Sequence, residues 1–273
     1  MNKFKGLLIC TDLDGTLLKD DKSISRENLD AIEYFKSEGG YFTFITGRMP
    51  YFMESICSKI HPNAPFGCIN GGGLYDYNKK EYVSAKTLDK TVTELIEYAD
   101  KNIASIGIQV YTFERIYFSR ENEAMKNFRK ATGIPNITAD YKDISEPFAK
   151  IVFGDESEEK ILALQELLLS HPRSREFDFI RSERTLYEIL PKGANKGSVL
   201  PKLCDHLGID QSKTIAVGDY NNDIAMIKSA GIGFAVANAC PEAKAAADHI
   251  TVSNEEHAIA KIIADIENGK LRI

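Results

Sequence analysis

Two aspartates separated by one residue are the most chemically informative feature of this sequence. Asp12 and Asp14 follow the largely apolar run 4–9, and a Gly-Thr pair comes directly after them. A short apolar run bounded by turn residues is typical of a buried strand. Two carboxylates at the end of such a strand could bind a divalent cation, and one could act as a nucleophile beside an acid or base. Because an isolated Asp-x-Asp-Gly is also a common turn, other segments must decide between the two interpretations.

Polar residues with similar placement occur at three further points along the chain. A Thr-Gly-Arg segment at 46–48 follows the apolar stretch 41–45, and a Gly-Asp-Tyr-Asn-Asn-Asp segment at 218–223 follows the apolar stretch 214–217. Lys196 lies near the start of a predicted helix. Ligands of open parallel sheets bind beyond the carboxyl ends of the strands, so these segments would meet in one crevice if their strands are neighbours. The carboxylates suit Mg²⁺, and the lysine and threonine suit a phosphate group.

An alternation of strands and helices predicts a doubly wound α/β fold for the start of the chain. Short apolar strands are expected at 6–10, 41–45 and 66–69. The helices between them are expected to begin near Ser25, as an N-cap, and near Pro50, in a first turn. This order of strands and helices is typical of a parallel sheet that helices cover on both faces.

The middle of the chain has a different pattern, which predicts an inserted domain. Residues 83–190 mix strands and helices without strict alternation, whereas the α/β pattern resumes after Pro191. A length of 273 residues is comfortable for two domains. We therefore predict a core domain formed by residues 1–82 and 191–273 and an inserted α+β domain formed by residues 83–190.

Composition and charge argue against several classes of protein. The net charge of -6 is unlike that of nucleic-acid-binding proteins, whose surfaces are usually basic. We find neither a signal peptide nor an apolar stretch of the roughly 18 residues that a membrane-spanning helix needs. The five cysteines are scattered and form no Cys-x-x-Cys pair, which favours reduced thiols over disulfides or a zinc site. We expect a cytoplasmic protein that binds neither nucleic acid nor a membrane.

Four ordered segments resemble the motifs of the haloacid dehalogenase superfamily. The Asp-Leu-Asp-Gly-Thr sequence at 12–16 matches its DxDGT signature, and Thr46, Lys196 and the segment 218–223 match its second, third and fourth motifs in order. The resemblance covers essentially the whole chain. The place of the insertion and the Asn-Gly-Gly sequence at 70–72 are similar to the Cof-type subfamily, which carries a type IIB cap there.

The resemblance implies a Mg²⁺-dependent phosphatase that acts on a small phosphorylated metabolite such as a sugar phosphate. Asp12 would attack phosphorus and form an aspartyl-phosphate, and Asp14 would protonate the leaving oxygen and then activate water. Asp223 would orient the lysine of the third motif or a metal-bound water. The implied metal ligands are Asp12, the Asp14 carbonyl and Asp219. The implied substrate contacts are Leu13, Thr46, Gly47, Lys196 and Asn222.

Two other functions remain open at this point. A phosphotransferase resembling phosphomannomutase shares these motifs and would pass the phosphoryl group to a sugar rather than to water. A protein that binds a phosphorylated ligand without turnover is the second alternative, against which the intact Asp12, Asp14, Lys196 and Asp219 argue. Phosphate release against phosphate transfer distinguishes the first two functions, and a failure to hydrolyse any phosphomonoester with Mg²⁺ would favour the third. The physiological substrate and the oligomeric state are left open by the sequence.

Polar residues of the inserted domain are candidates for substrate selection. The candidates on or beside its predicted strands are Lys150, Arg181, Arg184 and Glu188. Charged residues at strand edges are usually solvated, so a plain surface position is the simpler interpretation of each. In the core domain, Arg48 suits either a structural ion pair or a substrate contact.

One proline conflicts with the predicted helix after Lys196. If Asn195 is the N-cap, Pro201 falls at the sixth position of the helix, where it removes a backbone hydrogen bond. We therefore expect a kink there, or a helix that begins one turn later.

Overall fold

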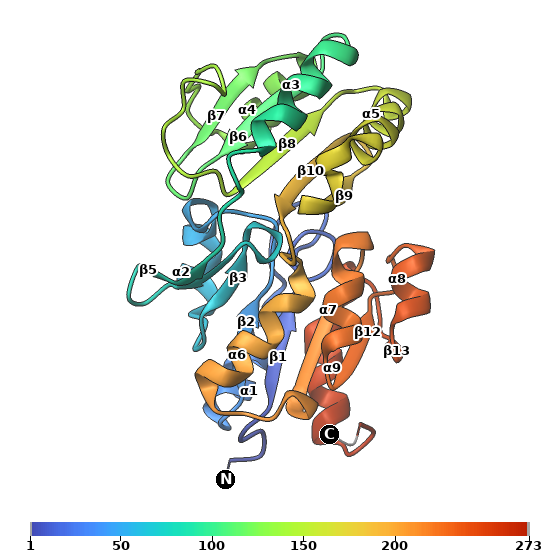
Figure 1. Ribbon diagram of the computed structural model, residues 1–273. Helices are drawn as coiled ribbons and strands as arrows, with labels where there is room; N and C mark the ends of the chain where they lie inside the picture. The colour runs from blue at the N-terminus through green and yellow to red at the C-terminus, as the bar shows by residue number, and fades with distance from the viewer. Residues whose placement is uncertain (1, 272–273) are drawn as a thin grey trace. The chain divides into compact units, whose positions relative to one another are not determined.

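The computed structural model describes residues 2–271, which divide into two compact units (Figure 1). The first unit runs up to Ala85 and resumes at Asn195, and the second comprises Lys86–Ala194. The second unit is therefore an insertion within the first. The sequence analysis placed these boundaries after residues 82 and 190. The role of the inserted unit in substrate selection stays a prediction.

A five-stranded parallel sheet forms the centre of the first unit, with strand order β13-β12-β11-β1-β2. β1 pairs with β2 on one side and with β11 on the other, in parallel in both cases. Strands from the two ends of the sequence thus lie side by side, and their carboxyl ends reach the same edge. The strands are β1 (Leu8–Thr11), β2 (Tyr41–Phe44), β11 (Thr214–Gly218), β12 (Ile232–Ala235) and β13 (His249–Ile250).

Helices cover both faces of this sheet. The β1-α1-β2 and β11-α7-β12 connections run in opposite directions along it, so right-handed crossovers place α1 and α7 on opposite faces. Leu8 and Cys10 of β1 pack with apolar residues of α6 and α7, while α9 packs against α1. This arrangement confirms the predicted doubly wound α/β fold. The helices of this unit are α1 (Arg26–Ser37), α2 (Glu54–Ile60), α6 (Val199–Leu207), α7 (Ile224–Ser229), α8 (Pro241–Ala246) and α9 (Ala258–Glu267).

The helix after Lys196 begins one turn late, as Pro201 predicts. A 3₁₀ turn, Lys196–Ser198, precedes α6, and Asn195 caps this turn by accepting the N–H of Ser198 at 3.0 Å. Pro201 consequently falls in the first turn of α6. Its missing N–H costs nothing there, because the first four N–H groups of a helix have no partner within the helix.

The third predicted strand lies in a different sheet from the one expected. β3 (Phe66–Cys68) forms an antiparallel sheet with β4 (Gly73–Asp76) and β5 (Glu81–Ala85). A parallel bridge between Ile45 and Gly67 joins it to the residue that follows β2. Since the turn between β3 and β4 is tight, the chain returns at once to pair with β3 as a hairpin.

The inserted unit is an antiparallel sheet with order β7-β6-β8-β10-β9, packed between helices. Ile108 and Phe153 belong to its buried core together with Leu164 of α5. On the opposite face, Met125 of α4 lies where a Cβ on Gly107 would be. The strands are β6 (Gly107–Tyr111), β7 (Ile116–Arg120), β8 (Lys150–Gly154), β9 (Phe177–Glu183) and β10 (Leu186–Pro191). The helices are α3 (Val92–Asn102), α4 (Glu123–Thr132) and α5 (Glu158–Ser170).

Two leucines of α5 provide a matched test of the core of the inserted unit. Leu164 is fully buried, whereas Leu162 is 43% exposed. We expect Leu164→Ala to lower the free energy of unfolding by about 2–5 kcal/mol, because it leaves a cavity, and Leu162→Ala to change it by about 0.5 kcal/mol or less. Urea denaturation followed by far-UV circular dichroism measures both. Equal losses in the two variants would contradict the packing described here.

Candidate active site

Three neighbouring strands end at residues that the sequence singles out. Asp12 directly follows β1, Asp219 directly follows β11, and Thr46 comes two residues after β2. The N–H of Asp12 donates to the carbonyl of Val217 at 2.9 Å, so β1 and β11 stay paired up to their ends. Because these strands are parallel, the three residues lie at one edge of the sheet.

Lys196 lies between two aspartates in a buried ion-pair cluster. Its Nζ is 2.7 Å from Asp12 Oδ1 and 2.6 Å from Asp223 Oδ1. Burial acts to lower the pKa of Lys196, but the two carboxylates outweigh it and hold the pKa above its usual value. Burial also raises the pKa of Asp12, which is 7% exposed. The cluster therefore keeps a positive charge beside Asp12, where an incoming anion could bind.

Asp223 holds this part of the site in place. One of its carboxylate oxygens binds Lys196, and the other accepts the backbone N–H groups of Asp219 and Tyr220 at 3.0 Å each. Gly218 lies close against it, since a Cβ at that position would be 2.4 Å from Asp223 Cβ. With both oxygens engaged, Asp223 suits the orienting role that its position in the fourth motif implies.

Three carboxylates lie close together at this edge of the sheet, and oxygen ligands are those that a hard metal ion prefers. One oxygen from each of Asp12, Asp219 and Asp223 lies within 4.8 Å of the other two. Burial, followed by the charge of Asp223, raises the pKa of Asp219 to about 6. A divalent cation would relieve this crowding of negative charge, and oxygen ligands suit Mg²⁺. The residues thus fit the predicted ion, with Asp12 and Asp219 as side-chain ligands and Asp223 engaged by Lys196.

The turn after β1 positions Asp219. The hydroxyl of the fully buried Thr16 donates to Asp219 Oδ1 at 2.7 Å. Gly15 has a φ of +78°, and a Cβ on it would lie 2.7 Å from Asp219 Oδ2. The sequence analysis gave Thr16 no role of its own. The available signal was its place at the end of the DxDGT signature.

Asp14 is held by two basic side chains. Arg48 makes a bidentate ion pair with Asp14, in which Nε lies 2.9 Å from Oδ2 and a terminal nitrogen lies 2.7 Å from Oδ1. Lys22 Nζ lies 2.9 Å from the same Oδ1. Burial acts to raise the pKa of Asp14, but Arg48 and then Lys22 outweigh it, so the pKa lies below its usual value. Arg48, for which the sequence left two interpretations open, forms this ion pair.

Leu13 and Thr46, two of the predicted substrate contacts, lie in the turns after β1 and β2. The side chain of Leu13 is fully buried, and its carbonyl accepts the N–H groups of Leu17 and Leu18 at 3.1 and 2.8 Å. Thr46 is also buried, and its hydroxyl accepts the N–H of Arg48 at 3.2 Å. Their contacts with substrate stay predictions.

Gly47 and Asn222, two further predicted contacts, meet through a residue without an assigned role. Asn222 Nδ2 donates to Asn70 Oδ1 at 3.3 Å. A Cβ on Gly47 would lie 3.0 Å from the same oxygen. The sequence signal for Asn70 was the Asn-Gly-Gly turn that resembles the Cof-type subfamily.

The polar candidates of the inserted unit form ion pairs within that unit. Lys150 and Glu188 are both buried, and their charged atoms lie 2.9 Å apart. Arg181 and Arg184 both pair with Glu158 at the start of α5. The structure therefore separates the four candidates into two groups with different surroundings.

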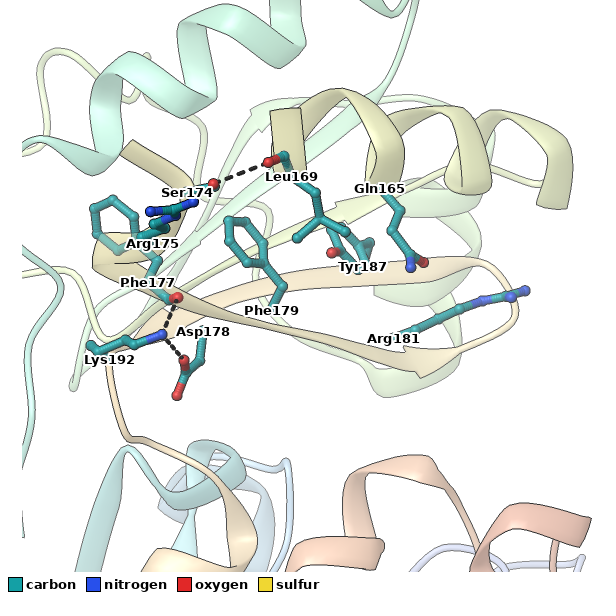
Figure 2. Close-up of a pocket in the computed structure, with 10 residues that line it drawn as sticks. All are labelled: Gln165, Leu169, Ser174, Arg175, Phe177, Asp178, Phe179, Arg181, Tyr187 and Lys192. Carbon is teal, nitrogen blue, oxygen red and sulfur yellow. Dashed lines mark hydrogen bonds and ion pairs between the residues drawn. The ribbon is translucent and has the colours of Figure 1, made fainter. Parts of the chain in front are cut away.

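A cavity of about 430 Å³ opens between α5 and the β9–β10 hairpin of the inserted unit (Figure 2). Phe179 and Tyr187 stack along it with ring centroids 5.8 Å apart. Arg181 lies at one end, and an ion pair of 2.8 Å between Lys192 and Asp178 lies at the other. Of the predicted candidates, Arg181 is thus the one that lines this cavity.

A family profile and related proteins agree with the geometry of the site. The profile of the haloacid dehalogenase-like hydrolase family matches residues 9–263. The chain belongs to this family. A Bacillus subtilis relative named 5-amino-6-(5-phospho-D-ribitylamino)uracil phosphatase YitU is 29% identical, over 96% of this chain and 97% of that protein. The HMP-PP phosphatase of Escherichia coli is 28% identical, over 90% of this chain and 89% of that protein.

Solved structures of haloacid dehalogenase-like hydrolases share the fold. The structure of one from Bacteroides thetaiotaomicron superposes with a TM-score of 0.82 at 27% identity. The match covers 96% of this chain and 100% of the Bacteroides chain. A subclass IIB sugar phosphatase superposes with a TM-score of 0.84 at 22% identity, covering 97% and 100%. These structures confirm the predicted fold, and the family profile with the named relatives confirms the predicted superfamily and the enzyme class of a phosphatase.

Two glycines with similar backbones test how Gly15 positions Asp219. Gly6 and Gly15 have φ values of +81° and +78°, but nothing lies within 4 Å of a Cβ on Gly6. Gly6→Ala should cost about 1–2 kcal/mol for the left-handed backbone alone. Gly15→Ala should cost more and also weaken Mg²⁺ binding, because the new methyl group displaces Asp219. Thermal unfolding with and without MgCl₂ measures both effects, since a bound ion raises the Tm. The same Mg²⁺-dependent rise in Tm in both variants would contradict this account.

Proposed function

We propose that this protein is a Mg²⁺-dependent phosphomonoesterase that works through an aspartyl-phosphate on Asp12. The observation that carries the proposal is the buried contact of 2.7 Å between Asp12 and Lys196 at the carboxyl end of β1. A carboxylate so placed is fixed in direction, and the ammonium beside it attracts the phosphate that the carboxylate would attack. The family assignment supports the same chemistry.

The reaction proceeds in two displacements at phosphorus. In the first, a carboxylate oxygen of Asp12 bonds to phosphorus, the ester P–O bond breaks, and Asp14 gives its proton to the leaving oxygen. In the second, water attacks the phosphorus of the aspartyl-phosphate, Asp14 takes its proton, and inorganic phosphate leaves with the carboxylate restored. The pair with Arg48 keeps Asp14 ionised, which suits the second step. An anionic phosphate beside Arg48 would weaken that pair and raise the pKa of Asp14, which suits the first.

Mg²⁺ would be held by Asp12, Asp219 and the carbonyl of Asp14. When bound, it supplies positive charge that lets an anionic carboxylate approach an anionic phosphate. Lys196, a fixed cation beside Asp12, would bind the phosphoryl oxygens. The hydroxyl of Thr46, the N–H of Gly47 and the amide of Asn222 complete the proposed contacts to these oxygens.

We propose a small phosphorylated metabolite as the substrate, such as a sugar phosphate. The names of the two related phosphatases above each include a small phosphorylated compound, which supports this class. All five cysteines are free thiols, which supports the expected location in the cytoplasm. Among residues 2–271, no helix has the length and apolar character needed to cross a membrane.

Replacement of the proposed nucleophile tests the mechanism. We expect Asp12→Asn to lower kcat by at least about 10³-fold, because an amide oxygen is a poor nucleophile. Asp205→Asn is the matched control, since Asp205 is exposed on α6, and it should retain full activity. Phosphate release is measured with a panel of sugar phosphates, nucleotides, flavin mononucleotide and pyridoxal phosphate. Near-normal release by Asp12→Asn would refute the mechanism, and transfer to a sugar without phosphate release would identify a phosphotransferase.

Removal of the metal tests the ligand set. We expect EDTA to abolish phosphate release and excess Mg²⁺ to restore it, because crowded carboxylates at Asp12 and Asp219 repel an anionic substrate when no cation is bound. Asp219→Asn should raise the Mg²⁺ concentration needed for half-maximal activity. Undiminished activity in EDTA would contradict the metal assignment.

A further inference from the structure

The turn between β3 and β4 has an unusual backbone. Ile69 and Asn70 adopt left-handed conformations in succession, with φ values of 55° and 52°. This region is unfavourable for residues other than glycine, and most of all for β-branched side chains such as that of isoleucine. Such a conformation persists where the surrounding structure enforces it, and functional sites are a common setting.

The segment after β2 enforces the conformation of this turn. The N–H of Ile69 donates to the carbonyl of Arg48 at 3.1 Å, and the N–H of Asn70 donates to the carbonyl of Thr46 at 3.0 Å. The turn is therefore hydrogen-bonded to the segment 46–48, which contains Thr46 and Gly47, two of the residues proposed to bind the phosphoryl group.

The side chain of Asn70 extends this connection to the fourth motif. Asn70 is fully buried, and its Oδ1 accepts the Nδ2 group of Asn222 at 3.3 Å. Its amide also lies against Gly47, where a Cβ would come within 3.0 Å of Oδ1 and 3.2 Å of Nδ2. One residue thus contacts both a backbone and a side chain that are proposed to hold the phosphoryl oxygens.

The next residue of the turn approaches the third motif. Gly71 has a φ of +93°, and a Cβ on it would lie 2.1 Å from the carbonyl oxygen of Asn195, the residue before Lys196. Only glycine fits such a close approach of two backbones. The turn at 69–71 consequently contacts three of the four motif segments.

We infer that Asn70 is a positioning residue that orients the amide of Asn222 toward the phosphoryl group. The inference rests on the proposed function. A side-chain amide has two N–H donors, and the bond to Asn70 fixes the plane of the Asn222 amide, so that the second N–H is presented in a defined direction. An oriented donor stabilises charge on the phosphoryl oxygens in the transition state without having to reorganise.

The variant Asn70→Gly removes the side chain but leaves the backbone of the turn unchanged, because glycine accepts the left-handed conformation without strain. We expect this variant to fold with an unchanged or higher Tm. Its affinity for orthovanadate, a mimic of the phosphoryl group in transfer, and its kcat should each fall about tenfold, the loss expected for one oriented hydrogen bond, with a smaller change in KM. Ser105→Gly is the control, because Ser105 also has a left-handed backbone, with a φ of 60°, but lies in the inserted unit.

A double-mutant cycle tests whether Asn70 acts through Asn222. In the Asn222→Ala background, Asn70→Gly should change vanadate affinity by less than about twofold, because the donor that it orients is gone. An equal loss in both backgrounds, or Asn70→Gly values within about twofold of the wild type, would overturn the inference. If Asn70→Gly does not fold, Asn70→Ser is judged by the same criteria, because its shorter side chain does not reach Asn222.

The wild type separates this inference from the proposed function. If the wild type releases phosphate and binds vanadate while Asn70→Gly matches it, the inference alone fails. If the wild type with Mg²⁺ neither binds vanadate nor releases phosphate from any member of the substrate panel, the proposed function and the inference fail together.

Discussion

The buried ion pairs of Lys196 are the constraint on which the site depends. An ammonium group without exposure to solvent is stable only with charged partners, and removing one partner of a buried pair costs about 3–5 kcal/mol. Asp12 comes from the start of the chain, whereas Asp223 and Lys196 come from beyond the inserted unit. Correct pairing therefore requires that β1 and β11 be neighbours, so the electrostatics of the site and the topology of the sheet support each other.

The direction of the crossovers explains why the chemistry lies at this edge. In the sheet, β1 and β11 are neighbours. From β1 the chain continues to β2 on one side of this pair, and from β11 it continues to β12 on the other side. The turns after β1 and β11 consequently diverge onto opposite faces, which opens space beyond the ends of these two strands. Asp12 and Asp219 are the first residues past those ends. They are held by the paired backbone of rigid strands, as a reaction that needs fixed directions demands.

The sequence predicted the features that depend on local pattern, and missed those that depend on packing. Ser25 caps α1 as predicted, and Pro201 correctly indicated a helix that begins late. The pairing of β3 with β4 and β5 was not predicted, and the turn between β3 and β4 holds an isoleucine in a left-handed conformation, against local preference. Asn70 and Thr16 were given no role of their own because each acts through a residue more than a hundred positions away in the sequence.

The two units differ in how they manage charge, and this difference bears on what each can recognise. In the first unit, Lys196 and the proposed metal ion supply the positive charge that an anion needs. In the inserted unit, Lys150 is buried against Glu188, and Arg181 shares Glu158 with a second arginine. The Lys150–Glu188 pair is neutral, whereas the two arginines on Glu158 outnumber it and leave a net charge of +1 (+2 −1). We therefore expect recognition of the proposed phosphate to depend on the first unit, and the part of the inserted unit in substrate selection stays a prediction.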